Sequence, residues 1–113
     1  MGPSEGKIKH LKKLSNQAGV IAAAAMDQRG SLQKSLASAR GVDPKQITPD
    51  MMSEFKTAVV KVLTPHASAI LLDPEYGLDA AKARAANAGL LLAYEESGYD
   101  NTQPGRLPDL LPH

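Results

Sequence analysis

A segment rich in hydrogen-bonding side chains follows the first apolar run of the chain. The run is VIAAAAM, residues 20–26, and the segment consists of Asp27, Gln28, Arg29, Gly30 and Ser31. An arginine offers a planar fork of donors that suits a phosphate, and a glycine permits a tight turn or the close approach of a ligand. Ser31 is placed to cap a following helix, whose N-terminus would also favour an anion. The segment therefore predicts a site for a polar, anionic ligand; the structural alternative for Asp27 is a simple loop cap.

Two further acids occupy the same kind of position, each after a short apolar run. Asp73 follows ASAILL and precedes a proline, and Glu95 follows LLLAY. Near-continuous apolar runs are typical of strands covered on both faces, as in a parallel sheet. Because the carboxyl ends of parallel strands lie at one edge, we expect the three acids to gather there, where the active sites of α/β proteins lie. Taken singly, Asp73 is also an ordinary turn residue and Glu95 an ordinary loop charge.

Helical segments separate the apolar runs and predict crossover connections between parallel strands. The expected strands are residues 20–26, 69–73 and 90–94. The expected helices cover Ile8 to Leu14, Ser31 to near Gly41, a segment capped by Thr48 and begun by Pro49, and an alanine-rich segment that ends at Gly89. This order predicts an α/β fold with three parallel strands in sequence order. Residues 101–113, with three prolines, are expected to form a loop or an interrupted element.

Composition excludes several classes of function. The chain has 113 residues, enough for one small domain, and a formal net charge of +1, which predicts neither a nucleic-acid nor an anionic-membrane partner. Without cysteine there are no disulfides or thiolate metal sites, and no histidine follows an apolar run, which argues against zinc. No apolar run approaches the ~20 residues of a membrane helix, and the first residues lack a secretory signal. We expect a cytoplasmic protein with no cofactor.

Three consecutive segments resemble the class I tagatose-bisphosphate aldolase family. They are LKKLSNQAGVIAAAAMDQRGSL, LTPHASAILLDPEYGL and GLLLAYEESGYD, followed by the tail RLPDLLPH. The resemblance implies a (β/α)₈ TIM barrel, a fold of about 250 residues or more. It also implies cleavage of a ketose bisphosphate, such as tagatose 1,6-bisphosphate, to dihydroxyacetone phosphate and glyceraldehyde 3-phosphate through a lysine Schiff base. Related members act on sulfosugar phosphates, so the phosphorylated sugar substrate stays open.

The resemblance assigns roles to residues at the strand ends. It implies that Asp27 and Gln28 contact substrate hydroxyls, and that Arg29 and Ser31 contact a phosphate. Two acids at the next strand ends are expected only to line the site: Asp73 and Glu95.

No lysine of the chain is expected to form the Schiff base. The reaction needs an amine kept neutral by desolvation or a neighbouring cation. All nine lysines are expected at polar helical positions or in loops, and none follows an apolar run. We therefore expect residues 1–113 to be the N-terminal portion of a single barrel domain, with the nucleophile on a later strand beyond His113. The chain alone is expected to be inactive.

Two other functions remain open. Asp27, Asp73 and Glu95 offer oxygen ligands for Mg²⁺, as in metal-dependent lyases on similar barrels. Alternatively, the chain is a non-catalytic partial barrel that acts as an assembly module. An incomplete parallel sheet exposes an edge and apolar faces, which predicts a homo-oligomer or association through that edge. The side chains expected at this surface are Leu90, Leu91, Leu92, Leu110 and Leu111.

Overall fold

A three-stranded parallel sheet forms the centre of the chain. The computed structural model describes residues 2–96, 98, 100–106 and 109–111. The strands pair in the order β1-β2-β3, all parallel, with bounds Ala23–Met26, Ala69–Leu72 and Gly89–Leu92. The α/β class, the parallel pairing and the predicted strand order are therefore confirmed. Each strand has four residues, so the strands are shorter than the apolar runs that predicted them.

Helices connect the strands at the predicted places. They are α1 Glu5–Leu14, α2 Gly30–Arg40, α3 Pro49–Leu63 and α4 Leu78–Ala83, with the short 3₁₀ helices η1 Pro44–Gln46 and η2 Thr64–His66. The start of α3 is as expected, because the Thr48 side chain accepts a hydrogen bond from the Met51 N–H at 3.2 Å. Gly41, with a φ of 67°, ends α2 in the left-handed conformation that favours glycine. No helix within the described residues is both long and apolar enough to cross a membrane.

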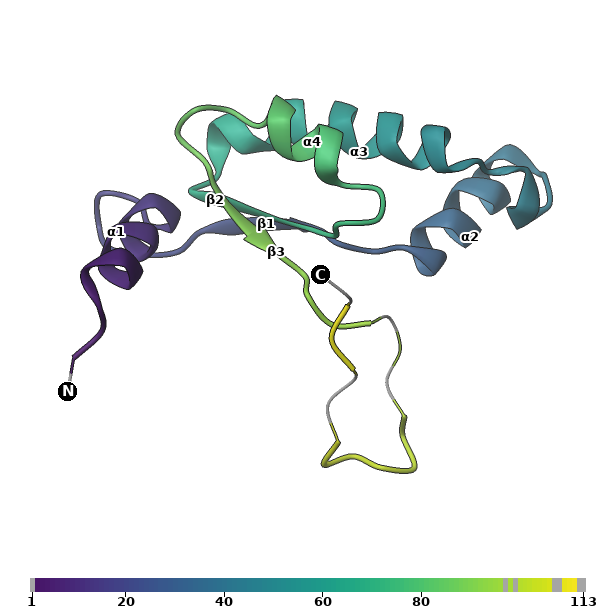
Figure 1. Cartoon of the computed structure of the whole chain (residues 1–113). Coiled ribbons are helices and arrows are strands. Elements are labelled where there is room, and N and C mark those ends of the chain that lie inside the picture. The colour runs from purple at the N-terminus through teal and green to yellow at the C-terminus, as the bar shows by residue number, and fades with distance from the viewer. Residues whose placement is uncertain (1, 97, 99, 107–108, 112–113) are drawn as a thin grey trace.

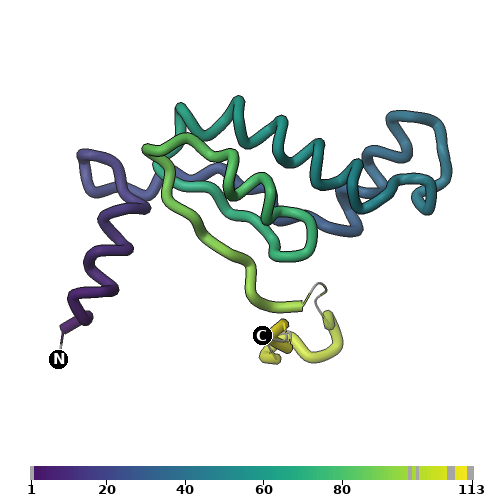
Figure 2. Tube along the Cα trace, turned by 45° about the horizontal axis from the view of Figure 1, so that its top comes forward, coloured from purple at the N-terminus to yellow at the C-terminus, as the bar shows by residue number. Residues whose placement is uncertain are grey.

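One face of the sheet packs against two helices. Figure 1 shows α3 and α4 side by side over this face, and Figure 2 shows the same arrangement from a second direction. The α1 helix lies near the ends where the strands begin, and α2 near the ends where they finish (Figure 1). The buried core between helices and sheet consists of Val60, Ile70, Leu72, Ala80 and Ala81. This layer fixes the carboxyl ends of β1 and β2 from one side.

The sequence predicted that the alanine-rich helix ends at Gly89, and this prediction is wrong. The α4 helix ends at Ala83, and Gly89 opens β3 instead. A Cβ atom at Gly89 would lie 2.6 Å from the carbonyl oxygen of Lys13, at the end of α1. Glycine is therefore required because α1 packs closely against the start of β3, not because a helix needs a cap.

The outer strand β3 is only partly covered. The register places Leu90 and Leu92 beside Ile70 and Leu72, yet Leu90 is 37% exposed and Leu92 45%. The radius of gyration is 16.0 Å, whereas a compact domain of this length has about 13 Å. The edge strand thus carries apolar side chains that the described residues leave in contact with water.

The C-terminal segment contains little regular structure. Between Asp100 and Arg106 the described residues form turns, and Glu95 pairs with Leu110 in an isolated antiparallel bridge. Four residues of the tail predicted as loop or interrupted element, 107, 108, 112 and 113, lie outside the described residues.

Candidate functional site

A cavity of about 810 Å³ lies where β1 and β3 end. It is lined by all four residues predicted to contact substrate: Asp27, Gln28, Arg29 and Ser31. The rest of its lining consists of Gly30, Lys34, Ala93, Glu95, Glu96 and Gly98. Two loops from strands that are not neighbours in the sheet therefore form one concave surface at the carboxyl edge, and several polar and charged side chains line it. That edge is where α/β enzymes bind their ligands.

Arg29 joins the two loops of the cavity. Its Nη2 donates a hydrogen bond to the carbonyl oxygen of Glu95 at 3.1 Å. Its buried Nε makes no hydrogen bond within the described residues. A buried polar group without a partner is costly, and a guanidinium satisfies its remaining donors well with an oxyanion. Arg29 is thus held in place and keeps a donor unused.

The first turn of α2 supplies further donors beside Arg29. The helix begins at Gly30, with Arg29 as its N-cap residue, and no side chain caps it. The prediction that Ser31 is the cap is wrong, because the helix starts one residue before it. The uncapped N–H groups of the first turn carry a partial positive charge. The geometry offers an anion both these groups and the Arg29 side chain.

Asp73 lies apart from the cavity, although it follows the strand next to β1. Its side chain is fully buried and forms an ion pair with the Lys56 ammonium. The other carboxylate oxygen, Oδ2, accepts a hydrogen bond from the Tyr76 N–H at 2.7 Å. The structure therefore brings Asp27 and Glu95 to one cavity and encloses Asp73 beneath the helices.

Lys56 contradicts the expectation that every lysine sits at a polar position. It lies on the buried face of α3 between Met52 and Val60, and it is 0% exposed. Its Nζ donates to the carbonyl oxygens of Met26 at 2.7 Å and Gln28 at 2.6 Å, besides Asp73. Met52, Lys56 and Val60 are four residues apart and therefore share one face of the helix. This spacing is the signal in the sequence that could have placed Lys56 on the buried face.

A hydrogen bond within the backbone closes the turn after β2. The Gly77 N–H donates to the Asp73 carbonyl oxygen at 3.1 Å, and a Cβ at Gly77 would lie 2.5 Å from that oxygen. A side-chain hydrogen bond with Glu75 raises the pKa of Tyr76, and burial and the nearby carboxylates raise it further. The segment from Asp73 to Gly77 thus forms a tight turn rather than an open loop.

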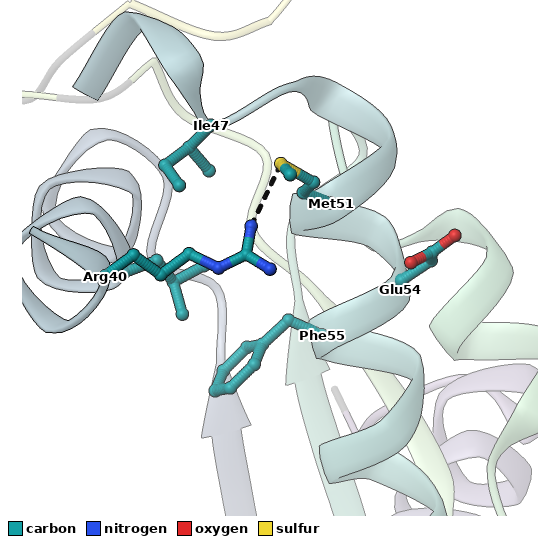
Figure 3. Close-up of a pocket in the computed structure, with 6 residues that line it drawn as sticks. Arg40, Ile47, Met51, Glu54 and Phe55 are labelled. Carbon is teal, nitrogen blue, oxygen red and sulfur yellow. Dashed lines mark hydrogen bonds between the residues drawn. The ribbon is translucent and has the colours of Figure 1, made fainter. Parts of the chain in front are cut away.

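A second cavity, of about 340 Å³, lies between α2 and α3 and contains none of the predicted site residues. Figure 3 shows the Arg40 side chain reaching across it toward Met51, whose Sδ is 3.7 Å from Arg40 Nη1. Its remaining lining is Leu36, Ile47, Glu54 and Phe55. This cavity is formed by α2, α3 and the segment between them, and no residue from the ends of the strands lines it.

No group of three His, Asp or Glu side chains within the described part of the chain is placed to hold a single metal ion. The magnesium alternative depended on three gathered carboxylates. Asp73 is already committed to Lys56, so these residues do not form the ligand set that the alternative required.

Parallel strands joined by helical crossovers, with polar loops at the carboxyl edge, define a protein of the α/β class, which includes the α/β barrels. Residues 21–112 match the family described as DeoC/LacD family aldolase, and the chain belongs to this family. Its fold is a TIM barrel, of which the three strands described above are a part. The family resemblance predicted from the sequence is confirmed.

Relatives with assigned names are similar over most of the chain. A tagatose 1,6-diphosphate aldolase 2 from Enterococcus faecalis is 59% identical over 106 residues, which cover 94% of this chain and 31% of that protein. A tagatose 1,6-diphosphate aldolase from Listeria monocytogenes is 54% identical over 108 residues, covering 96% and 31%. A tagatose 1,6-diphosphate aldolase 2 from Streptococcus agalactiae is 50% identical over 108 residues, covering 96% and 32%. The chain thus spans about a third of the length of these relatives.

Proposed function

We propose that this chain supplies the first part of the substrate site of an aldolase that cleaves a ketose bisphosphate, with tagatose 1,6-bisphosphate as the substrate. The observation that carries the proposal is the single cavity at the carboxyl edge, which gathers Asp27, Gln28 and Arg29. The names of the relatives support the substrate class. The products are dihydroxyacetone phosphate and glyceraldehyde 3-phosphate. A sulfosugar phosphate is the second candidate substrate, because it also presents hydroxyl groups and a phosphate, with a sulfonate in addition.

The two ends of the segment take different parts of the substrate. The Asp27 carboxylate accepts hydrogen bonds from sugar hydroxyls, and the Gln28 amide both donates and accepts. The Arg29 guanidinium, which lines the cavity, and the first turn of α2, where Ser31 lies, bind a phosphate. In this assignment, Asp27 and Gln28 orient the sugar, and the phosphate contact fixes the position of the sugar in the site.

We propose that the lysine that forms the Schiff base belongs to a segment outside these 113 residues. Lys56 is buried, with its three ammonium hydrogens engaged by three acceptors. The other eight lysines are exposed, whereas the reaction needs an amine in a desolvated place or beside another cation. Lys34 is the one lysine that lines the cavity, and its exposure argues against this role.

The test uses a hybrid enzyme in which this chain replaces the matching third of the Enterococcus faecalis relative. The hybrid should cleave tagatose 1,6-bisphosphate, keep its activity in the presence of a chelator, and lose it after borohydride treatment with substrate. The matched control is this chain alone, which should be inactive. Loss of activity with chelator but not with borohydride would replace the Schiff-base mechanism by a metal-dependent one.

The edge of β3 is proposed as an association surface. Leu90 and Leu92 are exposed there, and Leu110 is 63% exposed. Burying one such side chain contributes roughly 1.5–3 kcal/mol, so several together favour association. Sedimentation of the chain should show dimers or larger assemblies, and a compact monomer would contradict the proposal.

The cytoplasmic location expected from the sequence stays a prediction. A phosphorylated sugar is charged and does not cross a bilayer unaided, so the enzyme must share the compartment in which its substrate is made. Cell fractionation followed by detection of the protein tests the location.

A further inference from the structure

Lys56 is a buried cation that the proposed reaction does not use. It is fully buried on α3, and its ammonium contacts the backbone on both sides of Asp27. We propose that Lys56 is a positioning residue, which fixes Asp27 at the mouth of the site by holding the carbonyl groups of Met26 and Gln28. The proposal deepens the function proposed above and rests on it for the role of Asp27.

The contacts of Lys56 are complete and specific. An ammonium group has three hydrogens to donate, and the structure supplies three acceptors, namely Met26 O at 2.7 Å, Gln28 O at 2.6 Å and an Asp73 carboxylate oxygen. The two carbonyl groups belong to the residues immediately before and after Asp27. The Asp27 backbone therefore cannot shift toward or away from α3 without breaking a charge-assisted hydrogen bond.

Asp73 neutralises the charge of the buried Lys56 and connects Lys56 to the turn after β2. A buried charge without a partner is strongly unfavourable, and Asp73 neutralises Lys56 directly. Its second oxygen accepts the Tyr76 N–H, which belongs to the turn after β2. One ion pair therefore joins α3, the loop after β1 and the turn after β2 into a single rigid unit.

The position of the loop after β1 is important because Asp27 and Arg29 are proposed to bind the same substrate. Arg29 reaches the Glu95 carbonyl from the backbone that Lys56 holds, and Asp27 lies on that same backbone. A displacement of about 1 Å in a substrate-positioning group is enough to slow a reaction about a hundredfold. A hydrophobic residue at position 56 would fill the space between α3 and the sheet but would remove the ammonium donor from both carbonyl groups.

A role limited to stability makes a different prediction. Buried ion pairs often add little to stability compared with apolar residues of the same volume. If Lys56 only fills space, a neutral pair of similar shape will leave the loop and the reaction unchanged. If Lys56 positions the loop, that same neutral pair will loosen residues 27–29 while the fold persists.

The test changes both partners at once, so that no buried charge is left alone. Lys56→Met keeps most of the length of the side chain, and Asp73→Asn keeps an acceptor for the Tyr76 N–H. The matched control is the exposed pair of the same chain, changed by Lys82→Met with Asp79→Asn, whose charged atoms lie 3.8 Å apart at the surface. Backbone ¹⁵N order parameters are measured in the full chain, and kcat and KM for tagatose 1,6-bisphosphate in the hybrid enzyme.

In the Lys56/Asp73 variant, we expect the order parameters of residues 27–29 to fall from about 0.85, the value of rigid backbone, to below about 0.6, while those of the strands stay unchanged. We also expect kcat/KM to fall at least about tenfold, the effect of losing one hydrogen bond to a charged group. The control variant should show neither change. Unchanged order parameters at residues 27–29 would overturn the proposal.

Two further measurements keep the outcome decisive. If the variant does not fold, the unmodified chain is labelled with ¹⁵N-lysine and with ¹³C at the Met26 and Gln28 carbonyls. The Lys56 ammonium must then give a slowly exchanging signal coupled to both carbons, and its absence overturns the proposal. If the unmodified hybrid cleaves no substrate, the proposed function fails, whereas the order parameters still decide whether Lys56 holds the loop.

Discussion

Asp27 and Asp73 follow neighbouring parallel strands at equivalent positions, yet they lie in opposite environments. Asp27 is half-buried and lines an open cavity, whereas Asp73 is completely enclosed and paired with Lys56. The two ion pairs found within the described residues are Lys56–Asp73 and Lys82–Asp79, so Asp27 has no cationic partner of this kind. The end of a strand places each acid at the carboxyl edge of the sheet. Packing against α3 then determines whether the acid is buried, as Asp73 is, or lines the cavity, as Asp27 does.

The largest effect on stability is expected when the buried acid, Asp73, loses its cationic partner Lys56. Lys56→Met leaves the Asp73 carboxylate buried without its cationic partner, and removing one member of a buried pair costs about 3–5 kcal/mol. The loss should appear in urea denaturation of the chain. The matched change at the exposed pair, Lys82→Met, should cost less than about 1 kcal/mol. Equal losses for the two variants would mean that Asp73 is less sealed than described.

The open acid should respond in activity rather than in stability. Asp27→Ala in the hybrid enzyme should lower kcat/KM about ten- to a hundredfold, because one hydrogen bond to a charged group contributes ~1.5–3 kcal/mol. Lys12→Ala, on the exposed face of α1, is the control and should have little effect. A near-normal rate for the Asp27 variant, at unchanged melting temperature, would remove this residue from the site.

Glycines in the two loops sharpen the same contrast. Gly77→Ala should destabilise the chain by about 1–3 kcal/mol, because its Cβ would meet the Asp73 carbonyl oxygen at 2.5 Å and force the turn to shift. Gly30→Ala should cause no loss of stability, since a Cβ there meets nothing within 4 Å. Denaturation midpoints of the two variants compare the loops directly, and a larger loss at Gly30 would contradict the packing described.

The smallest expected effect concerns Tyr76 in the sealed turn. Its hydrogen bond with Glu75 holds the pKa of Tyr76 above the ordinary value, with burial as the second cause. Because the folded chain holds this proton more tightly, the associated stability is fully present below the unfolded pKa and is lost as pH rises through the folded pKa. Ultraviolet titration, corrected with Tyr76→Phe, should show the raised value, and Glu75→Gln should lower it. An unchanged titration in the Glu75 variant would exclude the hydrogen bond as the cause.

Local patterns were sufficient to predict the fold, but not which faces are buried. Apolar runs predicted parallel strands, and Thr48 with Pro49 predicted the start of α3, since both signals act within a few residues. Phe55 and Val62 are large apolar residues of α3, yet they are 38% and 69% exposed. The buried stripe instead contains a lysine, which hydrophobic periodicity cannot recognise. Its three acceptors lie 17, 28 and 30 residues away along the chain.

The candidate site was predictable in part for the same reason. The segment from Asp27 to Ser31 was recognisable because its polar residues are consecutive and follow an apolar run. The separation of Asp73 from Asp27 was not, because it depends on a contact between α3 and the turn after β2. Gly89 was misassigned because its requirement comes from Lys13 in α1, far away in the sequence.

The most direct test of the account is a crystal structure of the hybrid enzyme after borohydride has trapped tagatose 1,6-bisphosphate on it. We predict sugar hydroxyls within hydrogen-bond distance of Asp27 and Gln28 and a phosphate on Arg29 at the start of α2. Asp73 should remain buried against Lys56 without touching the ligand. A ligand that contacts Asp73 and leaves Asp27 free would contradict the division of roles between the two acids.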